Sequence, residues 1–108
     1  MSISLPLLHT IELGQTLTIA VVDEIGRTLL DGLDRHQALA VDCDAATEID
    51  ITFLQLLIAA QKSAKNSGRQ FGLKAPLPAV LTDAAARCGL AIIEGSAGLI
   101  LQPKGTPQ

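Results

Sequence analysis

Aromatic and basic residues are scarce in this sequence. Only 2% of its 108 residues are aromatic, namely Phe53 and Phe71, and tryptophan and tyrosine are absent. This scarcity argues against sites that stack nucleobases on aromatic rings, and against aromatic cages for sugars or cations. Eight lysines and arginines stand against eleven acidic residues, for a formal net charge of −3. Because the eight are scattered along the chain, we expect no binding of nucleic acid, which requires clustered positive charge.

Long apolar runs and paired cysteines are also missing. The longest apolar run, residues 56–60, is far shorter than the roughly 20 residues that cross a bilayer. The N-terminus lacks the basic stretch that is typical of a signal peptide. Cys43 and Cys88 have no neighbouring histidines, so they suit neither a zinc site nor a disulfide framework. We therefore expect a cytoplasmic protein with free thiols, no membrane span, no metal and no cofactor.

Aliphatic residues, by contrast, are plentiful enough for a packed core. Hydrophobic residues make up 48% of the chain and charged residues 18%, a balance typical of a folded domain. The length suits one domain, and no repeat or linker divides it. We expect a single domain over residues 1–108, with a core from about residue 10 to 101 and a frayed tail at 103–108.

The spacing of apolar residues predicts alternating strands and helices. Alternation over residues 11–19, on both sides of Gly14, indicates a half-buried β-hairpin. Helical spacing and helix-end signals predict three helices. Two of them span residues 22–34 and 52–67, and the third is opened by Pro76 and Pro78 and has apolar core positions from Leu77 to Cys88. Short apolar runs predict further strands at 38–41 and 70–73, and either a last strand or a short hairpin within 92–101. The order ββαβαβα predicts an α/β domain whose mixed sheet has helices packed on it.

Few residues suggest catalytic chemistry. His9 and His36 fall in no metal-ligand pair and are expected to be ordinary surface residues. No glycine-rich phosphate loop, nucleophile elbow or zinc-binding helix motif is present. Cys43 follows a predicted strand, where sites of α/β proteins often form, but no base is in view and a small buried thiol is the better interpretation. The interpretation of the protein as a small enzyme would depend on Cys43 and the nearby acidic residues alone.

Four carboxylates fall within nine residues after this strand: Asp42, Asp44, Glu48 and Asp50. One interpretation is a divalent-cation or phosphoacceptor site of the receiver type. Such a site also needs acidic residues after the first strand and a lysine after the fifth, and neither is convincing here. The favoured interpretation is a solvated loop, with Asp50 near the positive N-terminus of the next helix.

The start of the helix at 52–67 combines a cap with a modifiable hydroxyl. Thr52 and Gln55 match the capping box, in which each of the two side chains accepts a free backbone N–H. The Thr52 hydroxyl is also a candidate phosphorylation site. A phosphate there would add about −1.5 to −2 charges beside an already acidic loop.

A helical wheel predicts a contact surface next to Thr52. The core stripe of this helix consists of Phe53, Leu56, Leu57, Ala60 and Ala64. The side chains that then face outward are Gln55, Ile58, Ala59 and Lys62. Ile58 has no core role in this arrangement, which hints at a surface for a protein partner.

Three segments of the sequence carry a family resemblance. Residues 38–43 (ALAVDC) resemble a central strand that ends in an aspartate, and residues 49–54 (IDITFL) lie where an Asp-Ser-Ser-Gly-Leu motif belongs. Residues 59–73 resemble the helix, glycine stop and strand that follow. Over roughly residues 10–90 the sequence is thus similar to the STAS family of bacterial anti-sigma-factor antagonists and their relatives. Residues 87–90 also fit the usual helix, Gly, Leu ending of that family.

The resemblance implies a STAS-like α/β fold, with a mixed four- to five-stranded sheet and helices mainly on one side. It also implies a switch protein without catalytic activity. In antagonists of this family, a serine kinase that doubles as the anti-sigma factor phosphorylates the second serine of the motif, and this breaks the complex. Thr52 falls on that position and Asp50 on the motif's aspartate. Ile51 replaces the first serine and Phe53 the glycine, and the bulky Phe53 is expected to alter how a kinase approaches.

Together these features predict a bacterial, cytoplasmic, regulatory protein-interaction module that is not an enzyme. Residues DITFLQLL most resemble stand-alone STAS proteins of chemotaxis and signalling clusters. The expected partner is therefore a GHKL-type serine kinase that acts as an anti-sigma factor, or a chemotaxis signalling protein. Thr52 also resembles the STAS subunit of lipid-transport ABC systems, so the alternative is an accessory subunit that binds the ATPase of such a complex. The residues expected to contact the partner are Asp50, Ile51, Thr52, Gln55, Ile58, Ala59 and Lys62.

Overall fold

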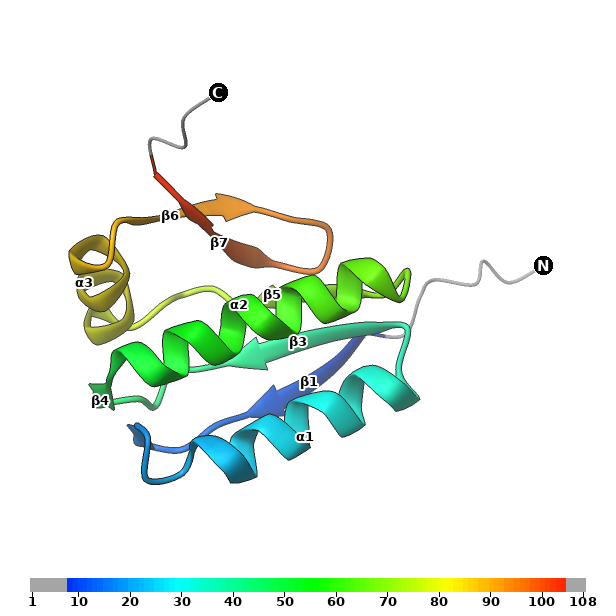
Figure 1. Ribbon diagram of the computed structural model, residues 1–108, viewed down its shortest axis with the longest axis horizontal. Coiled ribbons are helices and arrows are strands. Elements are labelled where there is room, and N and C mark those ends of the chain that lie inside the picture. The colour runs from blue at the N-terminus through cyan, green and yellow to red at the C-terminus, as the bar shows by residue number, and fades with distance from the viewer. Residues whose placement is uncertain (1–7, 105–108) are drawn as a thin grey trace.

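The computed structural model describes residues 8–104 of the chain. In this range the backbone forms, in chain order, β1 (Leu8–Glu12), β2 (Thr16–Leu17), α1 (Val22–Arg35), β3 (Ala38–Asp42), β4 (Glu48–Ile49), α2 (Ile51–Asn66), β5 (Gln70–Leu73), α3 (Ala79–Arg87), β6 (Leu90–Glu94) and β7 (Leu99–Pro103) (Figure 1). No helix in this range has both the length and the hydrophobicity needed to cross a bilayer. Pro103, expected in a frayed tail, instead ends β7, and the predicted tail at 105–108 lies outside the described residues.

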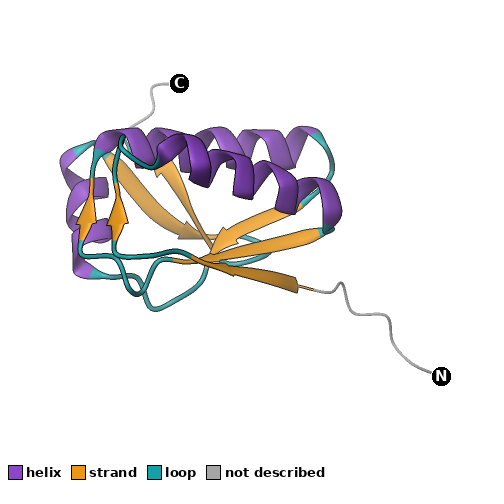
Figure 2. Cartoon of the chain, turned by 90° about the horizontal axis from the view of Figure 1, so that it is seen from below, coloured by secondary structure: helices purple, strands orange, loops and turns teal. Residues whose placement is uncertain are grey.

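The main sheet has five strands in the order β1-β3-β5-β7-β6. Strands β1, β3 and β5 run parallel, while β7 and β6 add an antiparallel pair at one edge. Helices α1 and α2 lie side by side across one face of this sheet (Figure 2), and α3 packs beside β6. The predicted α/β fold, with a mixed sheet and helices mainly on one side, is therefore confirmed.

The predicted β-hairpin over residues 11–19 is wrong. β1 pairs with β3, and β2 pairs in parallel with β4 as a separate two-stranded sheet. Gln15 supports this second pairing, because its carbonyl accepts the N–H groups of Thr47 and Glu48 (2.9 and 3.1 Å). Alternation of apolar and polar residues indicates a half-buried strand but does not specify its partner. As a consequence, the segment after β2 lies beside the segment after β4, where the candidate site forms.

Aliphatic side chains fill the core between the sheet and the two long helices. Helix α1 buries Ile25, Leu29 and Leu33, as their spacing predicts. Helix α2 buries Leu54 in addition to most of its predicted stripe, whereas Leu56 of that stripe is only half-buried. The reason is that α2 packs on α1, β5 and β7 at once. Its buried face is therefore wider than a stripe against one flat sheet would be.

The segment around α3 follows the predictions in part. Gly89 has φ +72° after the helix, and Leu90 is buried beyond it, as the helix-end signal predicts. Pro78 is the N-cap and lies just before the first turn rather than within it. Cys88, predicted on the core face, is the exposed C-cap because the helix ends at Arg87. Of the two alternatives for the C-terminal segment, the hairpin is correct, since β6 and β7 pair antiparallel.

Strand β7 joins the rest of the sheet partly through a side chain. The register between β5 and β7 contains one pair, Leu73 with Leu99, and the next facing positions, Phe71 and Leu101, do not pair. Instead the Gln61 Nε2 donates to the Leu101 carbonyl (2.9 Å), and the Gln61 Oε1 accepts the Leu101 N–H (2.8 Å). This carboxamide thus makes the two hydrogen bonds that a facing peptide group would make.

We expect Gln61→Ala to lower the free energy of unfolding by about 1–3 kcal/mol, because it leaves the buried N–H and carbonyl of Leu101 without a partner. Denaturation with urea, followed by circular dichroism, measures the change. Gln55→Ala, at an exposed site of the same helix, is the matched control and should cost less than about 0.5 kcal/mol. Equal losses in the two variants would contradict the connecting role of Gln61.

Candidate functional site

Asp50 ties two loops together at the start of α2. Its extended backbone (φ −120°, ψ 178°) lies between β4 and the first helical turn. Its Oδ1 accepts the N–H of Phe53 (3.2 Å), which caps the helix, and its Oδ2 accepts the N–H of Ile19 (2.9 Å) from the loop between β2 and α1. Its own N–H donates to the Leu17 carbonyl (3.3 Å). One residue therefore holds the loop at 18–21 beside the start of α2.

These hydrogen bonds lower the pKa of Asp50 below the ordinary value for aspartate. The Ile19 N–H is the largest cause, and the Phe53 N–H and the hydroxyl and N–H of Thr52 act in the same direction, while desolvation opposes them. A carboxylate whose pKa is lowered in the folded state stabilises the fold above its unfolded pKa, which is about 3.9. This stabilisation is lost as the pH falls through the lower, folded pKa.

The predicted capping box at Thr52 and Gln55 is wrong, because Asp50 occupies the N-cap position. Helix α2 begins at Ile51, so Thr52 lies in its first turn and is half-buried. Its hydroxyl helps to lower the pKa of the Asp50 carboxylate by hydrogen bonding. Asp and Thr are both favoured N-cap residues, and here Asp50 follows β4 directly with an extended backbone. A phosphate on Thr52 would therefore lie close to an existing negative charge.

The residues predicted to contact a partner differ in exposure. Three of them are half-buried, namely Asp50, Thr52 and Ile58, and four are exposed, namely Ile51, Gln55, Ala59 and Lys62. The expectation that Ile58 has no core role is wrong, since it packs against the hydrophobic core. Helix α2 contacts both α1 and β7, which covers much of its apolar surface. Ile51, by contrast, is 55% exposed and is available to a partner.

Ile19 belongs to the same surface, although sequence reasoning misses it. Its side chain is 69% exposed, and its hydrogen bond to Asp50 places it next to the first turn of α2 across 31 positions of sequence. Two exposed isoleucines and a threonine therefore gather at one end of the helix, and we name Ile19, Ile51 and Thr52 the α2 entry surface. No sequence signal marks Ile19, because its position depends on the pairing of β2 with β4.

Cys43 is buried and poorly suited to nucleophilic chemistry. Burial, and then the negative charge of Asp42, raises the pKa of its thiol to about 12. Asp42 accepts the Asp44 N–H at Oδ1 (2.9 Å), and its Oδ2 lies 3.9 Å from the Nζ of Lys74. Lys74 follows β5 and is therefore the lysine near the acidic residues that the sequence did not make convincing. Over residues 8–104, no three histidine, cysteine or acidic side chains come together as a metal site.

The two histidines contact each other at the surface. The rings of His9 and His36 stack with centroids 3.9 Å apart and planes inclined by 8°. His9 is exposed and His36 half-buried. They are surface residues as predicted, and their contact joins β1 to the end of α1.

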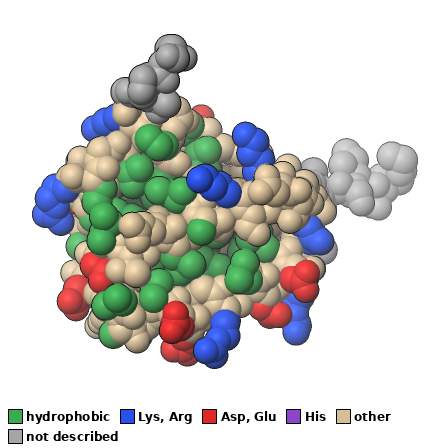
Figure 3. Space-filling model, viewed as in Figure 1, with side chains coloured by type: hydrophobic (Ala, Val, Ile, Leu, Met, Phe, Trp, Pro, Cys, Tyr) green, Lys and Arg blue, Asp and Glu red, His purple; other side chains and the backbone are tan. Residues whose placement is uncertain are grey.

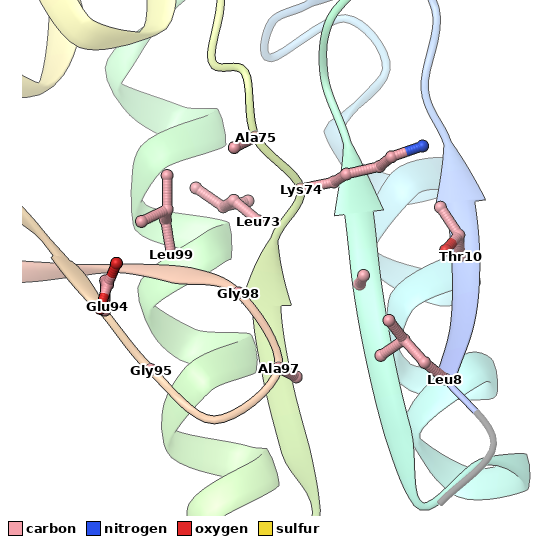
Figure 4. A pocket seen from close by; sticks show the side chains of 11 residues that line it. Leu8, Thr10, Leu73, Lys74, Ala75, Glu94, Gly95, Ala97, Gly98 and Leu99 are labelled. Carbon is pink, nitrogen blue, oxygen red and sulfur yellow. The ribbon is translucent and has the colours of Figure 1, made fainter. Parts of the chain in front are cut away.

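The sheet face that carries no helix has an apolar hollow of about 380 Å³. Figure 4 shows Leu8 and Thr10 on one side of it, the β6–β7 turn on the other, and Lys74 extended across β3. The turn comes this close because Gly72 has no side chain, since a Cβ there would lie 2.5 Å from the Gly98 nitrogen. The mainly aliphatic lining suits apolar contact rather than catalysis.

Comparisons with known proteins agree with this architecture. The family model described as "Mlab, STAS domain" matches residues 8–95. The chain belongs to the STAS domain family. Among solved structures, this STAS domain is similar in fold to the anti-sigma factor antagonist SpoIIAA in its unphosphorylated form, with a TM-score of 0.58 and 12% sequence identity over 76% of each chain. No curated protein matches the sequence.

We expect Asp50→Ala to lower the Tm by about 5 °C at pH 7, because the helix cap and the tie to Ile19 are lost together. Thermal melts from pH 7 downward should show this difference shrinking once the pH falls below about 3.9, where the unfolded chain begins to bind the proton, and disappearing as the pH falls through the lower pKa of the folded state. Asp44→Ala removes the same charge from the neighbouring loop and should change the Tm little. A Tm loss that does not depend on pH, or one that Asp44→Ala matches, would count against the role of Asp50.

We expect iodoacetamide to modify one thiol of the native protein, Cys88, and both thiols after denaturation. Cys88 is exposed, whereas the thiolate of Cys43 is rare because its pKa is raised to about 12. Mass spectrometry of the native and unfolded protein, with the modified peptides identified, measures this. Equal rates at the two cysteines in the native state would refute the assignment of Cys43 as inert.

Proposed function

We propose that this STAS domain is a cytoplasmic, bacterial regulatory module that binds a protein partner through the α2 entry surface and the adjacent exposed side chains of α2. The observation that carries the proposal is the pair of exposed isoleucines beside Thr52, held in place by Asp50. Each isoleucine contributes about 1.5–3 kcal/mol when a partner buries it fully. A surface that is already ordered loses little conformational entropy on binding.

The partner we propose is a GHKL-type serine kinase that acts as an anti-sigma factor, or a chemotaxis-type signalling protein. The STAS fold supports a regulatory interaction role, and the similar structure of SpoIIAA is that of an anti-sigma factor antagonist. Asp50 and Thr52 stand on the matching positions of the family motif. Ile51 and Phe53 are the two positions that depart from the family motif. Phe53 is buried in the core, so only Ile51 changes the exposed surface that a partner would contact.

Phosphorylation of Thr52 would switch this surface through electrostatics. The phosphate adds about −1.5 to −2 charges next to the Asp50 carboxylate, which is ionised at neutral pH because its pKa is lowered. Burial of that charge between Ile19 and Ile51 would carry a large desolvation cost. Phosphorylation therefore opposes the contact that the two isoleucines favour. That SpoIIAA is described in an unphosphorylated form supports such a two-state regulation.

We also propose that the domain has no catalytic activity. Cys43 is buried with a raised pKa, and the neighbouring Asp42 carboxylate accepts the Asp44 N–H and lies 3.9 Å from the Nζ of Lys74. The groups beside the start of α2 are two exposed isoleucines and a half-buried threonine, which suit contact with a protein rather than acid–base chemistry.

An accessory subunit of a lipid-transport ABC complex is the alternative. The observation that favours it is the threonine at the motif position, together with the match to the family model described as "Mlab, STAS domain". In this case the same surface would bind the ATPase constitutively. Binding that is independent of the charge at Thr52 would distinguish this function from a phosphorylation switch.

We expect Ile51→Glu and Thr52→Glu to reduce partner capture from native lysate at least about tenfold, because each places a charge in an apolar contact. Thr52→Ala keeps the surface uncharged and should bind as the wild type does. Leu30→Glu, a similar change at a 56% exposed leucine of α1, is the matched control and should leave capture unchanged.

Circular dichroism verifies that each variant is folded, and phosphosite mapping of the natural protein tests the modification itself. Loss of capture in Leu30→Glu as well as in Ile51→Glu would contradict the assigned surface. Full capture by Thr52→Glu, together with co-purification of an ATPase, would replace the switch with the accessory-subunit function.

A further inference from the structure

The gap between β5 and β7 opens into a groove of about 350 Å³. One wall is the C-terminal half of α2, and the other is the turn between β6 and β7, which lies beside this half of the helix in Figure 1. The start of β5 contributes the floor. The lining residues that matter here are Lys62, Lys65, Arg69, Phe71 and Ser96.

This groove gathers positive charge in a protein that is negative overall. Three of the eight lysines and arginines line it, and no acidic residue does. Within residues 8–104, Lys62, Lys65 and Arg69 each have no carboxylate within 4.0 Å. Figure 3 shows lysine and arginine side chains beside the β6–β7 turn on this face, while acidic side chains gather toward the α1 edge. Three cations around one hollow repel each other, and a bound anion would relieve that repulsion.

Arg69 lines this groove and also a second hollow beside α1, which it shares with Asp31 and Asp34. Its guanidinium donates to the His36 carbonyl (3.0 Å), and its backbone N–H donates to the Ala64 carbonyl (2.7 Å). The side chain is half-buried, and its guanidinium has further N–H donors besides the one that bonds to His36. A guanidinium fixed in this way binds an oxyanion with little further loss of entropy.

The floor offers a backbone donor as well. Gln70 and Lys74 donate their N–H groups to β3, so the peptide groups of Phe71, between them, point to the opposite side, toward β7. Phe71 pairs with no residue of β7, because the Gln61 side chain takes the facing position at Leu101. A buried N–H without a strand partner favours a ligand that accepts its hydrogen bond.

We propose that this groove binds a small phosphate-bearing ligand of the phosphomonoester class. Lys62, Lys65 and Arg69 balance its charge, and the Phe71 N–H and the Ser96 hydroxyl donate to its oxygens. The volume is at the lower end of the range for small-molecule sites, and three cations are too few for the extended contact that a nucleic acid requires. This site is separate from the α2 entry surface, since it lies along the half of α2 away from Thr52, and Lys62 alone belongs both to the groove and to the residues expected to contact the partner.

Titration of isotope-labelled protein with glycerol 3-phosphate, followed by amide chemical shifts, tests the proposal. We expect saturable shifts at Phe71 and Ser96. Lys65→Gln should weaken binding about tenfold through loss of one charge-assisted contact. Arg27→Gln removes a cation that lines a different hollow and should leave affinity unchanged. Absence of saturation up to about 10 mM, or equal weakening by both substitutions, would overturn the site.

Vesicles of phosphatidylcholine with and without phosphatidic acid distinguish a lipid headgroup from a soluble ligand. Binding to phosphatidic acid that Lys65→Gln removes would assign the phosphate to a lipid. Binding of glycerol 3-phosphate without vesicle binding would assign it to a soluble compound. Thr52→Glu should bind glycerol 3-phosphate normally, so failure of the groove and failure of the proposed function are separate outcomes. Loss of phosphate binding in Thr52→Glu would contradict the independence of the two sites.

Discussion

The candidate site depends on the two hydrogen bonds that the Asp50 carboxylate accepts. One of them starts helix α2, and the other holds the loop at 18–21 against that start. Both require the short pairing of β2 with β4, which brings the two loops together. The Asp50 side chain therefore connects three features: the parallel β2–β4 ladder, the N-terminus of α2 and the exposed apolar surface beside it. The carboxylate thereby holds the loop that carries Ile19 beside the helix start that carries Ile51.

Helix α2 presents different chemistry at its two ends. Beside its first turn lie the Asp50 carboxylate and two exposed isoleucines, Ile51 of the helix and Ile19 of the neighbouring loop, which suit a protein partner. Its C-terminal half has Lys62 and Lys65, joined in space by Arg69, around a hollow without acidic residues. These three basic residues lie within eight positions of sequence, and the β6–β7 turn opposite them has no charged side chain. Net charge therefore describes the whole surface poorly, since this hollow has basic side chains and no acidic ones.

Features that depend on neighbouring residues were predictable from the sequence. The helices follow from apolar spacing, as at Ile25, Leu29 and Leu33, and Gly89 marks the end of α3 because a positive φ is a local requirement. Features that depend on strand pairing were not. The partner of β2, the choice of Asp50 as cap and the placement of Ile19 all follow from the β2–β4 ladder. The prediction that Ile58 faces outward was wrong because it did not include β7, which also packs against α2.

The connection of β7 to the rest of the sheet at Leu101 depends on the identity of one side chain, Gln61. Backbone hydrogen bonds belong to nearly every residue type, so a strand junction built from them tolerates almost any side chain. Here the junction at Leu101 depends on glutamine in a helix. A change of side chain at position 61 would therefore act on the junction of β7 with the rest of the sheet, and would leave the backbone pairing of β6 with β7 in place.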